Sequence, residues 1–275
     1  MEIEITDQLA AISHPHRLAI FRLLVRRAPD AVPAGEIAQA LDFKPSTASA
    51  YLSVLTRAGL IIQTRHSNSL RYAFNPTAAQ SLITDLFLDC CRGRPELCSD
   101  LQDRTDPMPD RTYNVLFICT GNSARSIFAE AILRHEARDR FHAFSAGTRP
   151  YSELNPFAVE MLASKGIPVD DLRAKNVSEF QGADAPKMDF VFTVCDRAAN
   201  EDCPAWEGQP ISAHWGLPDP VKTEGTDAEM RLAFQQTYGM MRHRILAFAA
   251  LPFDALDRVS LQTQVDDIGR EKDFT

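Results

Sequence analysis

The first part of the chain contains segments in which apolar residues recur at helical spacing, and two segments in which apolar and polar residues alternate as in strands. Apolar residues recur at helical spacing over residues 16–27, 36–41, 46–58 and 78–91. Residues 60–65 and 70–74 alternate in polarity on either side of a polar loop at 66–69, as the strands of a hairpin do. Two short helices joined by a tight turn, the second polar on its outer side, predict a helix-turn-helix that is mainly α, with the hairpin as its β wing.

After a polar, proline-broken stretch at residues 99–111, apolar strands alternate with amphipathic helices. Strands are expected at residues 115–118, 141–147, 188–194 and 210–215, and helices from residue 127 and over 155–165 and 226–250. This alternation predicts an α/β fold with a four-stranded parallel sheet and helices on both faces. We therefore expect two domains, at residues 1–98 and 112–275, joined by a tether at 99–111.

Composition and charge refine this picture. Of the 275 residues, 45% are hydrophobic and 24% charged, which is ordinary for a soluble globular protein, and no apolar run approaches the ~20 residues that span a bilayer. The N-terminus lacks the features of a secretion signal, so we expect a cytoplasmic protein with reduced thiols and no membrane partner. Residues 9–75 contain eight Lys/Arg against three Asp/Glu, whereas residues 112–275 contain 17 against 24. This asymmetry suggests that the N-terminal part alone binds nucleic acid.

The most informative stretch joins the strand at 115–118 to the helix that begins near residue 127. The strand ends on Cys119, a short polar loop follows, and Arg125 precedes the helix. The first N–H groups of a helix have no internal partners, so the loop can wrap them around a tetrahedral oxyanion, with Arg125 as a planar fork of further donors. The candidate oxyanion-binding residues are Thr120, Gly121, Asn122, Ser123, Ala124, Arg125 and Ser126.

Cys119 lies in the field of these donors. The pKa of a thiol in such a place falls to roughly 3.5–7.5, so we expect a thiolate at neutral pH. A thiolate that faces a bound tetrahedral anion is a nucleophile directed at phosphorus or arsenic. The alternative is a structural cysteine buried at the end of a strand, which is common.

Residues 119–126 resemble the phosphate loop of the low-molecular-weight protein tyrosine phosphatase superfamily, and within it the chain looks most like the thioredoxin-coupled arsenate reductases. The resemblance covers about residues 113–269 and implies that Cys119 attacks arsenate. It also implies that Asp219 is the general acid, because residues 216–220 resemble the family's Asp-Pro loop. Many of these reductases have a further cysteine where this chain has Ala124, but the relay needs three thiols and activity is expected to survive.

The segment after the third expected strand resembles the redox segment of the same reductases. Cys195 follows that strand directly, and Cys203 comes after seven intervening residues. The resemblance implies that Cys195 attacks the sulfur of the Cys119–arsenic adduct and that Cys203 then resolves the Cys119–Cys195 disulfide. Thioredoxin is the implied reductant, with no bound cofactor. The alternative is a pair of loop cysteines without a redox role.

The N-terminal part resembles the ArsR family of winged-helix metalloregulators over nearly all of residues 5–98. The resemblance implies a homodimer on a palindromic operator, with the helix at 46–57 in the major groove and the wing against phosphates. The alternative is a small helical scaffold with a solvated basic face. The candidate DNA-binding residues are Lys44, Ser46, Thr47, Ser49, Ser53, Arg57, Arg65 and Arg71.

Three further thiols lie close together in the sequence. Many ArsR-family members carry a metal-binding Cys-Val-Cys on the helix before the recognition helix, but residues 36–40 of this chain contain no cysteine. Instead, Cys90 and Cys91 end the helix at 78–91, and Cys98 follows on the returning loop. Three thiolates can converge on one soft trigonal ion, and the pattern resembles the As(III)-sensing subset of the family, so arsenite is the expected effector. The alternative is that Cys90 and Cys91 are core residues of a dimer-forming helix.

Three functions therefore compete. The favoured one is an arsenic-responsive transcriptional repressor fused to an arsenate reductase. The second is a regulator fused to a low-molecular-weight tyrosine phosphatase, although Val221 and Lys222 follow the Asp-Pro where such phosphatases have aromatic residues. The third is a transcription factor whose C-terminal domain binds an oxyanion without catalysis, and the complete set of nucleophile, arginine, acid and two further thiols argues against it.

Overall fold

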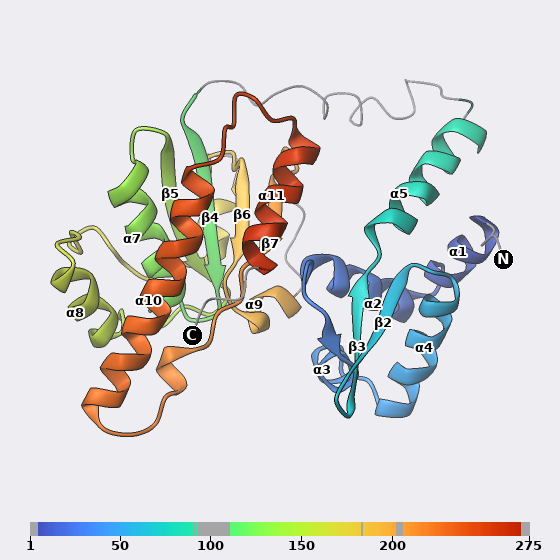
Figure 1. Cartoon of the computed structure of the whole chain (residues 1–275), viewed down its shortest axis with the longest axis horizontal. Coiled ribbons are helices and arrows are strands. Elements are labelled where there is room, and N and C mark those ends of the chain that lie inside the picture. The colour runs from blue at the N-terminus through green and yellow to red at the C-terminus, as the bar shows by residue number, and fades with distance from the viewer. Residues whose placement is uncertain (1–4, 91, 93–110, 183, 202–205, 271–275) are drawn as a thin grey trace. The chain divides into compact units, whose positions relative to one another are not determined.

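The chain divides into two compact units, Met1–Asp106 and Pro107–Thr275, which are described separately here (Figure 1). The computed structural model describes residues 5–90, 92, 111–182, 184–201 and 206–270. The tether expected at residues 99–111 lies outside the described residues except for Arg111. Among the described residues, no helix combines the length and the apolar character that crossing a membrane requires.

The N-terminal unit contains the expected helix-turn-helix and wing. Its helices are α1 (Ile5–Ile12), α2 (Pro15–Arg26), α3 (Ala34–Ala40), α4 (Pro45–Arg57) and α5 (Pro76–Asp85), which continues as the π-helical turn η1 (Leu86–Cys90). Its strands are β1 (Val32–Pro33), β2 (Ile61–His66) and β3 (Ser69–Phe74), which form an antiparallel sheet in the order β1-β3-β2. Proline occupies the first turn of α2, α4 and α5, where its missing N–H and fixed φ are best tolerated.

The inner face of α4 is apolar, as predicted. Ala48, Leu52 and Leu55 are buried, and the last two join a core with residues of α2 such as Leu23 and Leu24. The prediction of a four-residue hairpin loop at 66–69 is wrong, because the strands pair out to the ends of that stretch. The turn has two residues and is made possible by a positive φ at its first position.

The C-terminal unit is built on the predicted four-stranded parallel sheet. Its strands are β4 (Tyr113–Cys119), β5 (Phe141–Gly147), β6 (Phe190–Thr193) and β7 (Ile211–His214), in the order β5-β4-β6-β7. The helical segments are α7 (Arg125–Ala137), α8 (Pro156–Ser164), η3 (Val177–Phe180), α9 (Asp196–Asn200), η4 (Pro220–Lys222), α10 (Asp227–Ala249) and α11 (Arg258–Arg270). In the register of the sheet, Cys119 pairs with Gly147 and Ile118 with Thr193, so the carboxyl ends of three strands meet at one edge.

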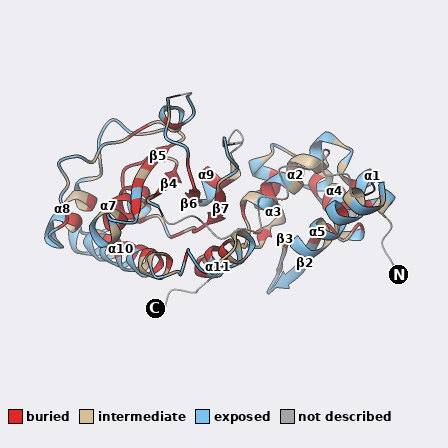
Figure 2. Cartoon of the chain, turned by 90° about the horizontal axis from the view of Figure 1, so that it is seen from above, coloured by how far each residue is buried: buried red, intermediate tan, exposed pale blue. Residues whose placement is uncertain are grey.

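Aromatic side chains fill the core of this unit. The rings of Phe192 and Trp215 stack with their centres 4.0 Å apart, and Phe248 packs edge-on against both. Figure 2 shows the strands of the sheet as buried, whereas α10 has one buried and one exposed face. Buried apolar residues at helical spacing also attach α11, an element that the sequence analysis did not predict, to the sheet next to β7.

Candidate functional site

The loop between β4 and α7 folds around the sulfur of Cys119. This cysteine is the last residue of β4 and is buried, and α7 begins at Arg125. The N–H of Asn122 donates to Cys119 Sγ at 3.0 Å, and the hydroxyl oxygen of Ser126 lies 2.9 Å from the same sulfur. The loop lies at the carboxyl edge of the strands, which is where ligands bind in open parallel sheets.

Asn122 supports the loop through its side chain. Its φ of 45° lies in the left-handed region, which asparagine tolerates better than most residues. Its Nδ2 donates to the hydroxyls of Ser126 and Ser145, at 2.9 and 2.8 Å, and its Oδ1 accepts from the N–H of Lys175 at 2.7 Å. The fully buried side chain of this candidate oxyanion-binding residue is thus committed to holding the loop in shape.

A hydrogen-bonded network connects the loop to a buried ion pair. Glu130 on α7 is fully buried, and its carboxylate accepts from Nζ of Lys175 at 2.9 Å and from Ser145 and Arg134. Ser145 is also the residue that accepts from the side chain of Asn122. Buried charges are tolerated only when they are paired and hydrogen-bonded, and this carboxylate meets both conditions. The sequence analysis missed the pair because Lys175 lies 45 positions from its partner.

Arg125 and Asp219, the candidate anion-binding arginine and general acid, form an ion pair. Nη2 of Arg125 lies 2.8 Å from Oδ2 of Asp219, and its Nη1 donates to the carbonyl of Leu217 at 3.0 Å. Asp219 is the N-cap of η4, where its side chain accepts from the N–H of Val221. The structure therefore brings the Asp-Pro loop against the phosphate loop, and an oxyanion bound by Arg125 would compete with Asp219 for the guanidinium.

Cys195 lies beside the same loop. It follows β6, the strand hydrogen-bonded to β4, and it is the N-cap of α9. Its buried Sγ is 3.5 Å from the hydroxyl of Thr120, the residue that follows Cys119. The structure thus brings two of the three predicted relay thiols to one edge of the sheet, and Cys203 lies outside the described residues.

The pKa of the Cys119 thiol lies above its ordinary value. Burial is the main cause and the neighbouring Cys195 adds to it, whereas the hydrogen bonds with Ser126 and Asn122 and the charge of Arg125 lower the pKa. The sequence shows the donors that favour a thiolate at Cys119, but it does not show the burial that opposes them. Formation of a thiolate at Cys119 is favoured by the three interactions that oppose burial.

An aromatic side chain that the sequence analysis did not include lies against the loop. The N–H of Tyr151 donates to the carbonyl of Gly121 at 2.9 Å. A Cβ on Gly121 would lie 2.5 Å from the ring of Tyr151, so close approach requires glycine at this position. The ring is 61% exposed and forms a wall beside the candidate anion site.

The outer face of α4 is polar and exposed. The candidate DNA-binding residues Lys44, Ser46, Ser49, Ser53 and Arg57 are exposed, and Thr47 is half-buried. The two arginines of the wing differ. Arg65 on β2 is exposed, whereas Arg71 on β3 is half-buried and donates to the carbonyl of Ala31 at 3.3 Å. Arg65 also donates, from its Nε to the carbonyl of Ser67 at 3.3 Å, so the two arginines differ mainly in exposure, and Arg65 is the more accessible to a phosphate.

Cys90 is exposed on η1, at the end of α5. The other two members of the expected arsenite site, Cys91 and Cys98, lie outside the described residues. Next to Cys90, the same helical segment exposes the apolar side chains of Ile83 and Leu88, at 52% and 60%. An apolar face of this kind on a helix is typical of a surface that another chain covers.

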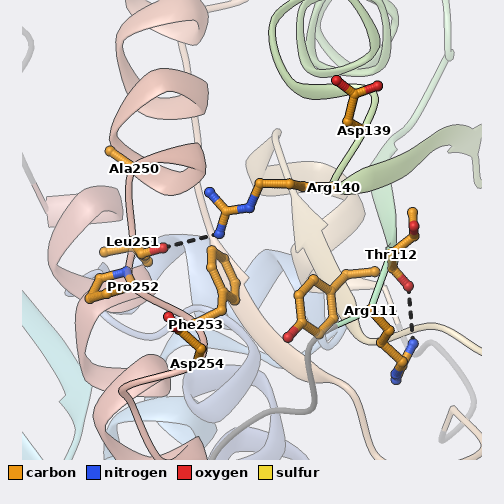
Figure 3. A pocket seen from close by; sticks show the side chains of 10 residues that line it. Arg111, Thr112, Asp139, Arg140, Ala250, Leu251, Pro252, Phe253 and Asp254 are labelled. Atoms are coloured by element: carbon orange, nitrogen blue, oxygen red, sulfur yellow. Dashed lines mark hydrogen bonds between the residues drawn. The ribbon is translucent and has the colours of Figure 1, made fainter.

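A cavity of about 530 Å³ opens at the opposite end of the parallel sheet (Figure 3). The rings of Tyr113 and Phe253, which line it, stack with their centres 5.2 Å apart. Arg140 donates to the carbonyl of Leu251 at 3.3 Å, and Arg111 forms an ion pair with a buried aspartate. Both guanidinium groups of the cavity therefore bind the protein itself, and the cavity is separate from the site around Cys119.

Comparisons with known families divide the chain in the same way as the fold. Residues 114–260, just over half of the chain, match the low molecular weight phosphotyrosine protein phosphatase family. Residues 12–64 match a family of helix-turn-helix domains. The first match contains the loop around Cys119, Cys195 and Asp219, and the second contains α3 and α4.

Individual relatives are similar to the C-terminal unit. An arsenate reductase of Shouchella clausii is 37% identical over 136 residues, which is 49% of this chain and 94% of the relative. An arsenate reductase of Bacillus subtilis is 32% identical over 136 residues, again 49% of this chain and 94% of the relative. A solved structure of an arsenate reductase in the phosphate binding state matches 50% of this chain and 98% of its own, with 25% identity and a TM-score of 0.42.

Proposed function

The chain belongs to the low molecular weight phosphotyrosine protein phosphatase family, and from this premise we propose that its C-terminal unit reduces arsenate to arsenite. The proposal rests on one observation, the pair of buried thiols Cys119 and Cys195, which follow adjacent strands of the sheet. Thr120, the residue after Cys119, has its hydroxyl 3.5 Å from the sulfur of Cys195. A phosphatase of this family needs the first thiol but has no use for the second. The relatives named arsenate reductase cover this same unit and support the choice.

The chemistry proposed is a relay of three thiols. The thiolate of Cys119 attacks the arsenic of arsenate and displaces one oxygen, which leaves as water after protonation. The thiolate of Cys195 then attacks the sulfur of Cys119. The electrons of the sulfur–arsenic bond pass to arsenic, arsenite departs, and a Cys119–Cys195 disulfide remains. Cys203 attacks Cys195, frees Cys119, and forms a Cys195–Cys203 disulfide that the dithiol of thioredoxin reduces.

Arg125 and Asp219 have distinct roles in this proposal. Arg125 binds two oxygens of the oxyanion with its planar fork of donors. Asp219 delivers the proton to the oxygen that leaves arsenic in the first step, and this requires that Asp219 be protonated once the oxyanion has taken its place at Arg125. The present ion pair holds the acid within reach of the loop until then.

A phosphatase activity is the second candidate, and the ring of Tyr151 against Gly121 favours it because an aromatic wall suits an aryl phosphate. The two activities differ in whether they require Cys195. Hydrolysis of p-nitrophenyl phosphate needs Cys119 but no second thiol, so a Cys195→Ser variant would keep it. Reduction of arsenate requires both thiols and would be lost in that variant.

Trapping the relay tests the proposal. Cys203→Ser should complete one turnover with arsenate and accumulate a Cys119–Cys195 disulfide, which peptide mapping by mass spectrometry detects. Cys195→Ser, the matched control, should form no such bond. Sustained thioredoxin-linked turnover by Cys203→Ser would contradict the relay.

The N-terminal unit acts, in this proposal, as an arsenic-responsive repressor. The polar face of α4 enters the major groove of a palindromic operator, and Arg65 binds a neighbouring phosphate. Two copies of the chain pair through the exposed apolar residues of α1 and α5, among them Leu9, Ile83 and Leu88. Arsenite is the effector and binds the thiols at positions 90, 91 and 98. All of this chemistry requires reduced thiols, as the cytoplasm maintains.

The fusion makes arsenate an inducer only after its reduction. An electrophoretic shift of operator DNA, measured with arsenate and the thioredoxin system, tests this coupling. Wild type should release the DNA and Cys119→Ser should retain it, while added arsenite should release both. Release by arsenate in the absence of reductant would mean that the regulator senses the oxyanion directly.

A further inference from the structure

The side chain of His214 is hydrogen-bonded to Thr193 and Asp196, which lie on either side of Cys195 in the sequence. The imidazole is fully buried at the end of β7, with its Nε2 3.0 Å from Oδ1 of Asp196 and its Nδ1 2.8 Å from the hydroxyl of Thr193. A carboxylate only accepts hydrogen bonds, so Nε2 carries the proton and, in the neutral ring, Nδ1 accepts from Thr193. Thr193 is the last residue of β6 and Asp196 the first of α9, which places Cys195 between the two contacts.

The glycine at position 216 makes this contact possible. A Cβ on Gly216 would lie 2.6 Å from Nε2 of His214 and 2.9 Å from Oδ1 of Asp196, so any larger residue would push the pair apart. The resemblance of residues 216–220 to the family's Asp-Pro loop gives a role to Asp219, but it gives no reason for a glycine at position 216. Gly216 thus has a role of its own, which is to let the imidazole reach α9.

Helix α9 is held by tertiary contacts, which include the packing of Ala198 and Ala199, both 1% exposed, and the hydrogen bond between Asp196 and His214. It is five residues long, and a helix of this length is marginal without tertiary contacts. Just beyond its end, Glu201 lies 3.8 Å from Arg149 and 4.0 Å from Arg197, and long pairs with arginines that are 69% and 67% exposed contribute little. The hydrogen bond with His214 differs in that its donor is a fully buried imidazole, although Asp196, its charged acceptor, is 60% exposed.

We propose that the His214–Asp196 hydrogen bond is a latch that keeps Cys195 buried beside the phosphate loop until the relay has to expose it. Cys195 is 2% exposed here, yet a Cys195–Cys203 disulfide has to reach the active site of a second protein to be reduced. The first turn of α9 therefore opens during each cycle, and His214 and Asp196 are positioning residues that set how often it opens. The proposal deepens the proposed reductase function and rests on it for its purpose, but not for its test.

Alkylation of the full-length, reduced chain tests the latch without arsenate or turnover. Iodoacetamide labelling of Cys195 and Cys119 is followed in one sample by mass spectrometry. Asp196→Ala should raise the labelling rate of Cys195 about tenfold, the effect of losing one charge-assisted hydrogen bond to a buried donor, and leave that of Cys119 unchanged. Asp196→Asn can still accept from Nε2 and should restore most of the protection. Arg197→Ala, the matched control on the same helix, should behave as wild type.

Gly216→Ala keeps both latch residues and should raise the labelling of Cys195 in the same direction as Asp196→Ala. The proposal is overturned by wild-type labelling of Cys195 in Asp196→Ala, or by an equal rise at Cys119, which reports a general loosening of the fold. If the wild type does not reduce arsenate but Asp196→Ala selectively raises the labelling of Cys195, the proposed function is wrong and the latch is supported. If the wild type reduces arsenate but Asp196→Ala does not raise the labelling of Cys195, the proposed function is supported and the latch is wrong.

Discussion

Nη2 of Arg125 lies 2.8 Å from Oδ2 of Asp219, so the arginine of the phosphate loop and the carboxylate of the Asp-Pro loop are partners before any substrate binds. Both side chains are largely buried, at 13% and 23% exposed, so water and salt screen this pair less than they screen a surface salt bridge. An oxyanion with two oxygens in the fork of Arg125 has to displace this carboxylate. In the proposed mechanism, substrate binding and release of the general acid are therefore one event.

Asp219→Asn should separate the role of Asp219 as general acid from its competition with the oxyanion for Arg125. We expect kcat for arsenate reduction to fall by about 10²–10⁴-fold, because no group remains to protonate the departing oxygen. Protection of Cys119 from alkylation by inorganic phosphate should be retained or strengthened, because Arg125 has lost its competitor. Asp227→Asn, an exposed carboxylate at the start of α10, should change neither quantity. Loss of phosphate protection in Asp219→Asn would mean that the aspartate helps to bind the anion.

The pH dependence of Cys119 alkylation should report the hydrogen bond with Ser126. That bond lowers the pKa of a thiol whose burial raises it, so Ser126→Ala should shift the midpoint of the alkylation profile to higher pH. The thiolate of the variant then forms only at a pH above that needed by wild type. Ser152→Ala, an exposed position outside the loop, should leave the midpoint in place. A midpoint that stays constant or falls in Ser126→Ala would contradict the assignment.

Lys175→Met should destabilise the C-terminal unit. The change leaves the buried carboxylate of Glu130 with less charge compensation, and breaking one side of a buried pair costs about 3–5 kcal/mol. We expect the lower end of this range, because Arg134 still pairs with Glu130. Urea unfolding measures the difference, and the exposed Lys165→Met should stay within about 0.5 kcal/mol of wild type. A second change, Glu130→Gln, should recover part of the loss. No recovery would show that Lys175 acts mainly through packing.

The two wing arginines should differ in DNA binding. Arg65→Ala should weaken binding to the operator and reduce the salt dependence of the affinity by about one counterion, because an exposed phosphate contact is lost. Arg71→Ala should have a smaller effect on the salt slope, because Arg71 is half-buried and its guanidinium donates to the carbonyl of Ala31. Fluorescence anisotropy at several salt concentrations measures both. The opposite order would mean that the wing rearranges on DNA.

Elements with a strong local pattern were predictable from the sequence. The strand at 141–147 and the helix at 226–250 match β5 and α10 closely, since the strand pattern and the amphipathic pattern are local signals. Cys119 and Arg125 stood out because their spacing lies within one short loop. The short helix α1 and the polar helix α11 were not predicted, although Leu261, Val265 and Ile268 do recur at helical spacing.

The support of the site could not be predicted in the same way. Lys175 reaches Glu130 across 45 positions and Asn122 across 53, and His214 reaches Asp196 across 18, so each contact exists only because the sheet brings the segments together. The pKa of Cys119 could not be judged from the sequence for a related reason. Hydrogen-bond donors can be identified in a loop sequence, but the depth of burial that opposes them depends on the whole fold.

Arsenate-dependent oxidation of NADPH, coupled through thioredoxin and thioredoxin reductase, tests most directly whether this chain is an arsenate reductase. Wild type should sustain oxidation that requires arsenate, thioredoxin and the protein together. Cys119→Ser should show none above background, because a hydroxyl is far less nucleophilic than a thiolate. Oxidation that persists in Cys119→Ser would contradict the proposed nucleophile. A wild type that hydrolyses p-nitrophenyl phosphate but oxidises no NADPH with arsenate would show that the unit is a phosphatase.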